Sequence, residues 1–301
     1  MKTLKYLLAA LGLGLASPSI SIASDCYHIA KILPNYEKQF ESVSAGHDSD
    51  RFKPKREFFW ILDETTPFSR EMFKDMYELS KKQLAPGDAI YIASFSYNGK
   101  DNGVSRFLKP LFEYKLDLPI DEKKDAKLST LIGHEDLRKY DQCLANQKGY
   151  VEKKIGLYAK GVMDGYSPTI SKSEILYSLK EISVRVNQSK AKERVILLSS
   201  DMLENSAVTS FYKNNIPKKI NPQSEWANAD VKSMIGDFGG AKVYVYGAGI
   251  VGSDVNTKDG AISRDPQTIM ALQAFWTQYF KASNATLIAF GHPTPTITPA
   301  P

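Results

Sequence analysis

The sequence predicts an α/β protein with a doubly wound, mostly parallel sheet and helices on both faces. The five consecutive apolar residues from Phe58 to Leu62 suit a central strand that is covered on both faces. A second run, Val195 to Leu198, has the same character and also ends in hydroxyls and an acid. Strand and helix patterns alternate from Phe58 to Gly291 without a linker, which favours one domain.

The first 23 residues have the features of a secretory signal peptide. Lys2 and Lys5 precede a short apolar stretch, residues 6–16, and Ser21-Ile22-Ala23 supplies a small-x-small cleavage pattern. The apolar stretch is too short for a comfortable membrane span. We therefore expect a periplasmic or secreted protein with no membrane span after signal removal.

Cys26 and Cys143 are the only cysteines in the chain. In an exported protein, two cysteines are most simply explained as one disulfide. This bond would join the new N-terminus to a segment in the middle of the chain. Residues 24–56 have few periodic apolar positions, and we expect them to be an N-terminal extension.

The charge of the chain is too small to indicate nucleic-acid binding. Loss of Lys2 and Lys5 with the signal peptide lowers the formal net charge from +5 to +3. The four histidines show no paired metal-ligand spacing, and the common hydrolase motifs are absent from the sequence. These observations favour a binding protein over an enzyme.

The remaining elements follow from periodicity and from turn residues. Pro110 places its strand at an edge or at an irregular position, and Ser171 with Glu174 has the spacing of a capping box. We expect an insertion near residues 119–148, which are rich in charge, and a disordered tail at residues 292–301. The expected elements are helix 72–84, strand 88–95, strand 107–118, helix 151–162, helix 175–186, strand 194–201, strand 241–247, helix 269–280 and strand 285–291.

Polar side chains follow two of the apolar strands. Asp63, Thr65, Thr66 and Ser69 come after the first strand, and Asp201 comes after the strand that begins near Arg194. Ligands of parallel α/β sheets usually bind beyond the carboxyl ends of the strands. We therefore expect the functional site at this edge.

These residues give the chain a resemblance to von Willebrand factor A-like domains over roughly residues 57–291. The resemblance rests on Asp63-Glu64-Thr65-Thr66-Pro67 before a helix, on Ser173 at the start of a later helix, and on Leu197 to Asp201. In that family, three loops of this kind form a metal-ion-dependent adhesion site. The resemblance implies an exported protein-binding module that acts in an envelope, secretion or conjugation assembly.

The resemblance also implies the ligands of a cation. Asp63 matches the first acid of the family motif, Thr65 the first hydroxyl, Ser173 the second-loop threonine and Asp201 the last acid. Carboxylate, hydroxyl and water oxygens suit Mg²⁺ or Mn²⁺. An acidic side chain of a partner protein would complete the coordination.

Pro67 departs from the family pattern, because it stands where the motif has a second serine. Thr66 or Ser69 could replace that oxygen, or the site could be degenerate and bind no metal. A structural interpretation also exists, in which Thr66 and Pro67 form the N-cap and first position of a helix and Ser171 or Ser173 caps a later one.

The sequence also matches two enzyme patterns in part. A haloacid dehalogenase-like phosphatase would use Asp63 as its nucleophile and Ser199 as its second-strand hydroxyl, but the late strand is not followed by the expected acidic pair. The segment from Gly247 to Gly252 matches the spacing of a dinucleotide-binding fingerprint. That fingerprint requires a helix after the glycines, but residues 253–260 have the composition of a loop. We therefore interpret the glycines as the turn that follows a strand.

Overall fold

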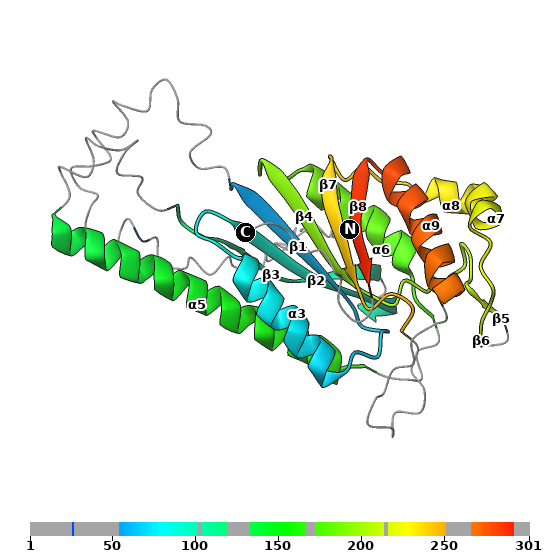
Figure 1. Ribbon diagram of the computed structural model, residues 1–301, viewed down its shortest axis with the longest axis horizontal. Coiled ribbons are helices and arrows are strands. Elements are labelled where there is room, and N and C mark those ends of the chain that lie inside the picture. The colour runs from blue at the N-terminus through cyan, green and yellow to red at the C-terminus, as the bar shows by residue number, and fades with distance from the viewer. Residues whose placement is uncertain are drawn as a thin grey trace, which may run out of the picture.

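The computed structural model describes Cys26 and residues 54–101, 104–118, 133–166, 172–213, 216–250 and 266–291. The expected signal peptide, the C-terminal tail and most of the N-terminal extension lie outside the described residues. Within these ranges the chain forms one six-stranded sheet flanked by helices (Figure 1).

The sheet confirms the predicted fold class. Its order is β3-β2-β1-β4-β7-β8, and every neighbouring pair is parallel except β2 with β3. The predicted central strand, β1, lies between β2 and β4. The six strands are β1 (Arg56–Asp63), β2 (Ala89–Asp101), β3 (Val104–Lys115), β4 (Glu193–Ser199), β7 (Ala241–Tyr246) and β8 (Ala285–Gly291).

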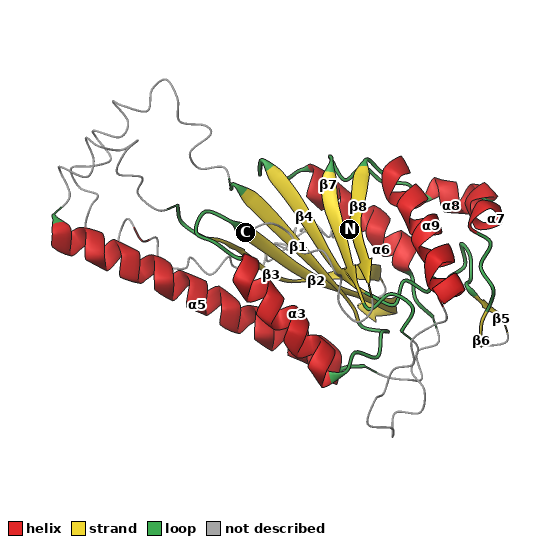
Figure 2. Ribbon diagram, in the orientation of Figure 1, coloured by secondary structure: helices red, strands yellow, loops and turns green. Residues whose placement is uncertain are grey.

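Two separate cores cover the two faces of the sheet, which explains the unbroken apolar runs. In β1, Phe58, Trp60 and Leu62 belong to one core, whereas Phe59 and Ile61 belong to the other. The first core is covered by α3 (Arg70–Gln83) and α5 (His134–Asp164), and the second by α6 (Ile175–Asn187) and α9 (Pro266–Ala282). Figure 2 shows the helices on either side of the strands. Because successive side chains in a strand point to opposite faces, both faces of β1 must be apolar.

Strand β3 lies at the edge of the sheet, as Pro110 indicates. It pairs antiparallel with β2, and the register shifts between Ile92 and Ala93, which lie opposite Phe112 and Pro110. A proline has no N–H for the ladder, so an edge position with a bulge tolerates it. The predicted edge strand is therefore confirmed.

Helix α3 begins later than the Thr66-Pro67 interpretation requires. Its N-cap is Ser69, whose hydroxyl accepts a hydrogen bond from the Met72 N–H at 3.2 Å. The Thr66 hydroxyl instead accepts a hydrogen bond from the Asp201 N–H. The prediction that Thr66 caps this helix is therefore wrong.

Helix α5 is much longer than the helix expected from Val151. It runs without interruption from His134 to Asp164 and extends along the sheet beside α3 (Figure 1). Residues 134–148, which we expected to be part of an insertion, form its first half. Residues 119–132 lie outside the described ranges, so the bounds of an insertion stay a prediction.

The start of α6 differs from the expected capping box. Glu174 is the N-cap residue and its side chain makes no capping hydrogen bond, while Ser171 lies outside the described residues. The first turn is instead capped from a distance, because Glu204 Oε2 accepts a hydrogen bond from the Leu176 N–H at 2.9 Å. The prediction that Ser173 caps this helix is therefore wrong as well.

Smaller elements complete the side of the molecule near α9. Strands β5 (Tyr212–Lys213) and β6 (Ile216–Pro217) form a separate two-stranded sheet. It is followed by the short helices α7 (Pro222–Ala227) and α8 (Ala229–Ser233). None of the helices in the described part of the chain has both the length and the apolar content needed to cross a membrane.

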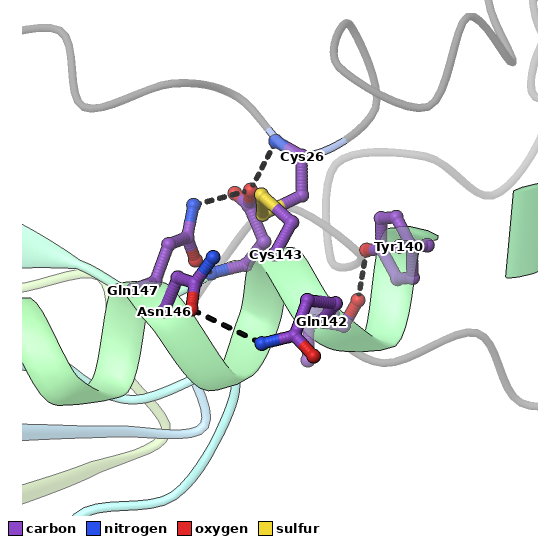
Figure 3. Close-up of a disulfide and its surroundings, with 8 residues drawn as sticks. Cys26, Tyr140, Gln142, Cys143, Asn146 and Gln147 are labelled. Carbon is purple, nitrogen blue, oxygen red and sulfur yellow. Dashed lines mark hydrogen bonds between the residues drawn. A yellow bond between two sulfur atoms is a disulfide. The ribbon is translucent and has the colours of Figure 1, made fainter. Parts of the chain in front are cut away.

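The predicted disulfide between Cys26 and Cys143 is present, and it attaches the N-terminal segment to α5 (Figure 3). Asp117, just after β3, accepts hydrogen bonds on Oδ2 from the Cys26 N–H at 2.9 Å and from Gln147 Nε2 at 2.8 Å. Gln147 Oε1 in turn accepts from the Asp117 N–H at 3.1 Å. These contacts tie the N-terminal segment, the end of β3 and α5 together around the bond.

Candidate functional site

The sheet register brings the two acid-bearing loops to the same edge. Strands β1 and β4 are adjacent and parallel, and Leu62 pairs with Ser199 in the last rung of their ladder. Asp63 is the last residue of β1, and Ser200 and Asp201 follow directly on β4. The carboxyl ends of these two strands therefore form the rim that the sequence predicts.

Asp63 is buried at this rim with both carboxylate oxygens occupied. Oδ1 accepts hydrogen bonds from the Thr65 N–H at 2.8 Å and from the Thr65 hydroxyl at 2.5 Å. Oδ2 accepts a hydrogen bond from the Ser200 hydroxyl at 2.7 Å. Burial raises the pKa of Asp63, and the hydrogen bonds from Thr65 and Ser200 oppose that rise. A nearby cation would favour the charged form of this carboxylate.

Thr65 connects Asp63 to Ser173. The Thr65 hydroxyl lies 3.2 Å from the Ser173 hydroxyl as well as 2.5 Å from Asp63 Oδ1. Ser173 is held in place by a backbone pair with Asn205, in which each residue donates its N–H to the carbonyl of the other. Three of the four predicted site residues are therefore in direct contact.

Asp201, the fourth predicted residue, lies on the neighbouring loop and is fixed by three contacts. Its N–H donates to the Thr66 hydroxyl at 2.9 Å, and its carbonyl accepts from the Gly249 N–H at 2.7 Å. Its own Oδ1 accepts from the Leu203 N–H at 2.8 Å. The loops after β1, β4 and β7 are thus joined at Asp201.

Both hydroxyls that could compensate for Pro67 already hold a backbone N–H. The Thr66 hydroxyl accepts the Asp201 N–H, and the Ser69 hydroxyl caps α3. The oxygen donors at this edge are therefore Asp63, Thr65, Ser173 and Asp201, together with Ser200, which the sequence reasoning missed.

This donor set fits a hard cation that keeps several water ligands. Mg²⁺ is commonly held in proteins by one or two carboxylates and completes its octahedral coordination with water. Two carboxylates and neutral hydroxyls give this composition. Among the described residues, no group of three or more histidine, cysteine, aspartate and glutamate side chains is suited to a metal. A cation here would therefore depend on hydroxyl and water oxygens as well.

Ser199 is not placed for the role that the phosphatase alternative gives it. Its hydroxyl is fully buried, accepts the Trp60 indole N–H at 2.9 Å and faces the Met76 sulfur. Asp63 is also only 1% exposed, and hydroxyls occupy both of its oxygens. A nucleophilic carboxylate needs an oxygen that is open to substrate.

The glycine-rich segment after β7 has a structural role as far as it is described. Gly247 has φ = +86°, and a Cβ at this position would lie 2.7 Å from the Phe68 ring. Gly249 has φ = +75° and holds the Asp201 carbonyl. Only glycine combines this backbone with so close an approach. Gly252 and the residues that would follow a fingerprint lie outside the described residues.

Glu204 is a second buried carboxyl near this edge that sequence reasoning missed. Glu204 is fully buried, and this burial raises the pKa of its carboxyl to about 8. The Ser206 side chain and the first turn of α6 oppose the rise. The one signal in the sequence is a charged residue among Met202, Leu203 and other small or apolar neighbours.

Comparisons with known proteins leave the family open. No protein-family model matches the chain, and no curated protein matches it. Among solved structures, the chain is similar to an aerotolerance-related membrane protein from Bacteroides fragilis NCTC 9343, crystallised with multiple mutations to serines. That match has 11% identity and a TM-score of 0.33, and it covers 79% of this chain and 92% of the other.

The Glu204 carboxyl predicts a pH dependence of stability. The folded pKa of about 8 exceeds the ordinary value of 4.5, so the folded state binds the proton more tightly than the unfolded state. The stabilisation is present below about pH 4.5 and is lost as the pH rises through about 8. In chelator-containing buffer, Glu204→Gln should flatten the decline in unfolding free energy between pH 5 and pH 8, measured by urea unfolding.

The control for this prediction is Glu135→Gln, at a glutamate whose side chain is 73% exposed. This variant should keep the wild-type slope. Equal slopes for wild type and Glu204→Gln would contradict the role of Glu204.

Proposed function

We propose that this protein is an exported, non-enzymatic von Willebrand factor A-like module that binds another protein through the edge formed by Asp63, Thr65, Ser173 and Asp201. The observation that carries the proposal is the contact of one hydroxyl, on Thr65, with both Asp63 and Ser173 at the carboxyl end of the central strand. Asp63 and Thr65 share one loop, whereas Ser173 comes from another segment, 108 positions from Thr65. Their meeting point is where parallel α/β sheets usually bind ligands.

The donor set supports Mg²⁺ or Mn²⁺ as the ion. Asp63 and Asp201 would supply the charge, and Thr65 and Ser173 would supply neutral oxygens. A bound ion offers a positive centre that an acidic side chain of the partner can approach. The alternative is a metal-free structural component that uses the same edge without an ion.

The disulfide supports an oxidising compartment, because such bonds persist in exported proteins and are rare in the cytosol. It is in keeping with the expected signal peptide and a periplasmic or secreted location. We propose an envelope, secretion or conjugation assembly as the setting.

Calorimetric titration with Mg²⁺ and Mn²⁺ tests the cation. The wild-type protein should give saturable heat, and Asp63→Asn should lose it, because the substitution removes the central charge but keeps the size of the side chain. The matched control is Asp75→Asn, at an exposed aspartate on α3, which should bind like wild type. An absence of heat with wild type, or unchanged heat with Asp63→Asn, would refute the cation.

The partner claim has its own experiment. Immobilised wild-type protein and Asp75→Asn should retain the same envelope protein from an extract, and retention should stop with chelator or with Asp63→Asn. Retention that is unaffected by both treatments would indicate the metal-free alternative.

A further inference from the structure

Glu174 and Glu204 lie near each other beside the candidate site. Ser173 and Asn205 form an isolated antiparallel bridge, with N–H to carbonyl distances of 3.2 and 3.0 Å. Glu174 and Glu204 are the residues next to this bridge, one on each of the two paired backbones. The charge of Glu174 also acts on Glu204.

Both carboxylates are buried, and each has an oxygen with no hydrogen-bond partner. Glu204 is 0% exposed and Glu174 is 7% exposed. Glu204 Oε2 accepts the Leu176 N–H, but Glu204 Oε1 and Glu174 Oε2 have no partner in the structure. Buried carboxylates without partners are costly, and two near each other are more so.

The groups around this pair supply little positive charge. Burial raises the pKa of Glu204 and the charge of Glu174 adds to the rise, whereas the Ser206 side chain and the start of α6 lower it. Lys172 acts on Glu174 from an exposed position and lowers its pKa, although burial raises that pKa overall. Lys172 and the first-turn N–H groups of α6 oppose the rise but do not prevent it, because the pKa of both glutamates stays raised.

We propose that Glu174 and Glu204 form a second cation site, selective for Ca²⁺. A divalent cation would neutralise both carboxylates and give the two unpartnered oxygens a ligand at once. Ca²⁺ suits the position better than Mg²⁺, because it accepts flexible geometry and backbone carbonyls, whereas Mg²⁺ retains several waters that a buried pair has little room to hold.

A cation here would connect the two segments that build the candidate functional site. Glu174 follows Ser173 directly, and Glu204 belongs to the loop that begins at Asp201. Glu204 also holds the first turn of α6 through Leu176. Calcium would therefore stabilise the placement of Ser173 relative to Asp201 without touching a partner protein.

The test uses the full mature chain carrying Asp63→Asn, which removes the ion proposed for the functional edge. Adding Ca²⁺ after chelator should raise the melting temperature of this variant by about 5 °C at saturation. Adding Glu174→Gln or Glu204→Gln to the same background should weaken Ca²⁺ binding at least about tenfold, measured by calorimetry. Glu135→Gln in that background is the matched control and should change nothing.

A second measurement does not depend on whether the glutamate variants fold. Tb³⁺ can replace Ca²⁺ and emits light when a nearby aromatic ring is excited. Trp276 donates its indole N–H to the Met202 carbonyl at 2.9 Å, two residues from Glu204. Excitation of Asp63→Asn at tryptophan wavelengths should give Tb³⁺ emission that Ca²⁺ displaces.

The outcomes separate the two sites. If wild type binds a cation but Asp63→Asn shows neither the Ca²⁺ shift nor displaceable Tb³⁺ emission, the glutamate site is overturned and the proposed function keeps its ion. If Asp63→Asn responds to Ca²⁺ and wild type shows no additional binding of Mg²⁺ or Mn²⁺, the glutamate site stands and the functional-edge ion is refuted. An absence of response in every variant overturns both ions and indicates that a proton neutralises the pair.

Discussion

Replacing Cys26 and Cys143 together by serine is expected to lower the free energy of unfolding by roughly 2–5 kcal/mol. The disulfide joins residues 117 positions apart, and a long closed loop strongly restricts the unfolded chain. Both cysteines are buried, so serine would also place two hydroxyls in buried positions. Urea unfolding at neutral pH measures the change.

Two further measurements check the origin of this effect. Wild type treated with reductant should unfold at the urea midpoint of the double variant, and alkylation without reductant should leave the intact mass of wild type unchanged. Equal midpoints for oxidised wild type and the double variant would show that the bond contributes no stability. Two alkylated thiols in the untreated protein would refute the bond itself.

Asp88→Ala is expected to lower the free energy of unfolding by about 3–5 kcal/mol, because it removes one partner of a buried ion pair. The Asp88 side chain is 1% exposed and the Arg56 side chain 11%. Asp88 accepts Arg56 Nε at 3.1 Å, Arg56 Nη2 at 2.7 Å and the Ala85 N–H at 2.9 Å. The variant leaves a buried guanidinium without this carboxylate, and the turn before β2 without its anchor.

An exposed ion pair on the same sheet is the natural control. Glu193 pairs with Lys242 at 2.7 Å, and these side chains are 38% and 50% exposed. Glu193→Gln should cost less than about 1 kcal/mol, because water and salt screen the exposed pair. Similar losses for Asp88→Ala and Glu193→Gln in urea unfolding would contradict the importance of burial.

The sheet could be predicted from the sequence because its strands are covered on both faces. Phe58 to Leu62 and Val195 to Leu198 are unbroken apolar runs, a pattern that requires helices on both sides. The edge strand was marked by a single proline. The disulfide could be predicted because the chain has only two cysteines, which leaves one possible pair.

Helix α5 was harder to predict because the buried face of its first half, Tyr140, Cys143, Leu144 and Gln147, is only partly apolar. Its first part carries exposed charges such as Glu135, Asp136 and Lys139, which interact with one another along the helix. Local ion pairs stabilise such a segment without giving a strong apolar period. The charge pattern therefore suggested an insertion.

The candidate site was only partly predictable, because some of its contacts join segments that are distant in sequence. Asp63, Thr65 and Asp201 stand directly after apolar strands, so their position at the sheet edge follows from the pattern. Glu204 caps α6 from a distant loop, and no local spacing shows a contact across 28 positions. The competing local interpretation, a cap from Ser173, used the nearest hydroxyl and was wrong.

The central pair of strands also affects how fast the chain can fold. Trp60 in β1 and Ser199 in β4 hydrogen-bond across 139 positions, and β1 has no other neighbour on that side. Such pairing must close a very long loop before its contacts stabilise anything, which slows folding. During that delay the apolar β1 segment is exposed and prone to aggregation. A chain of this design therefore benefits from help with folding until β4 has been paired.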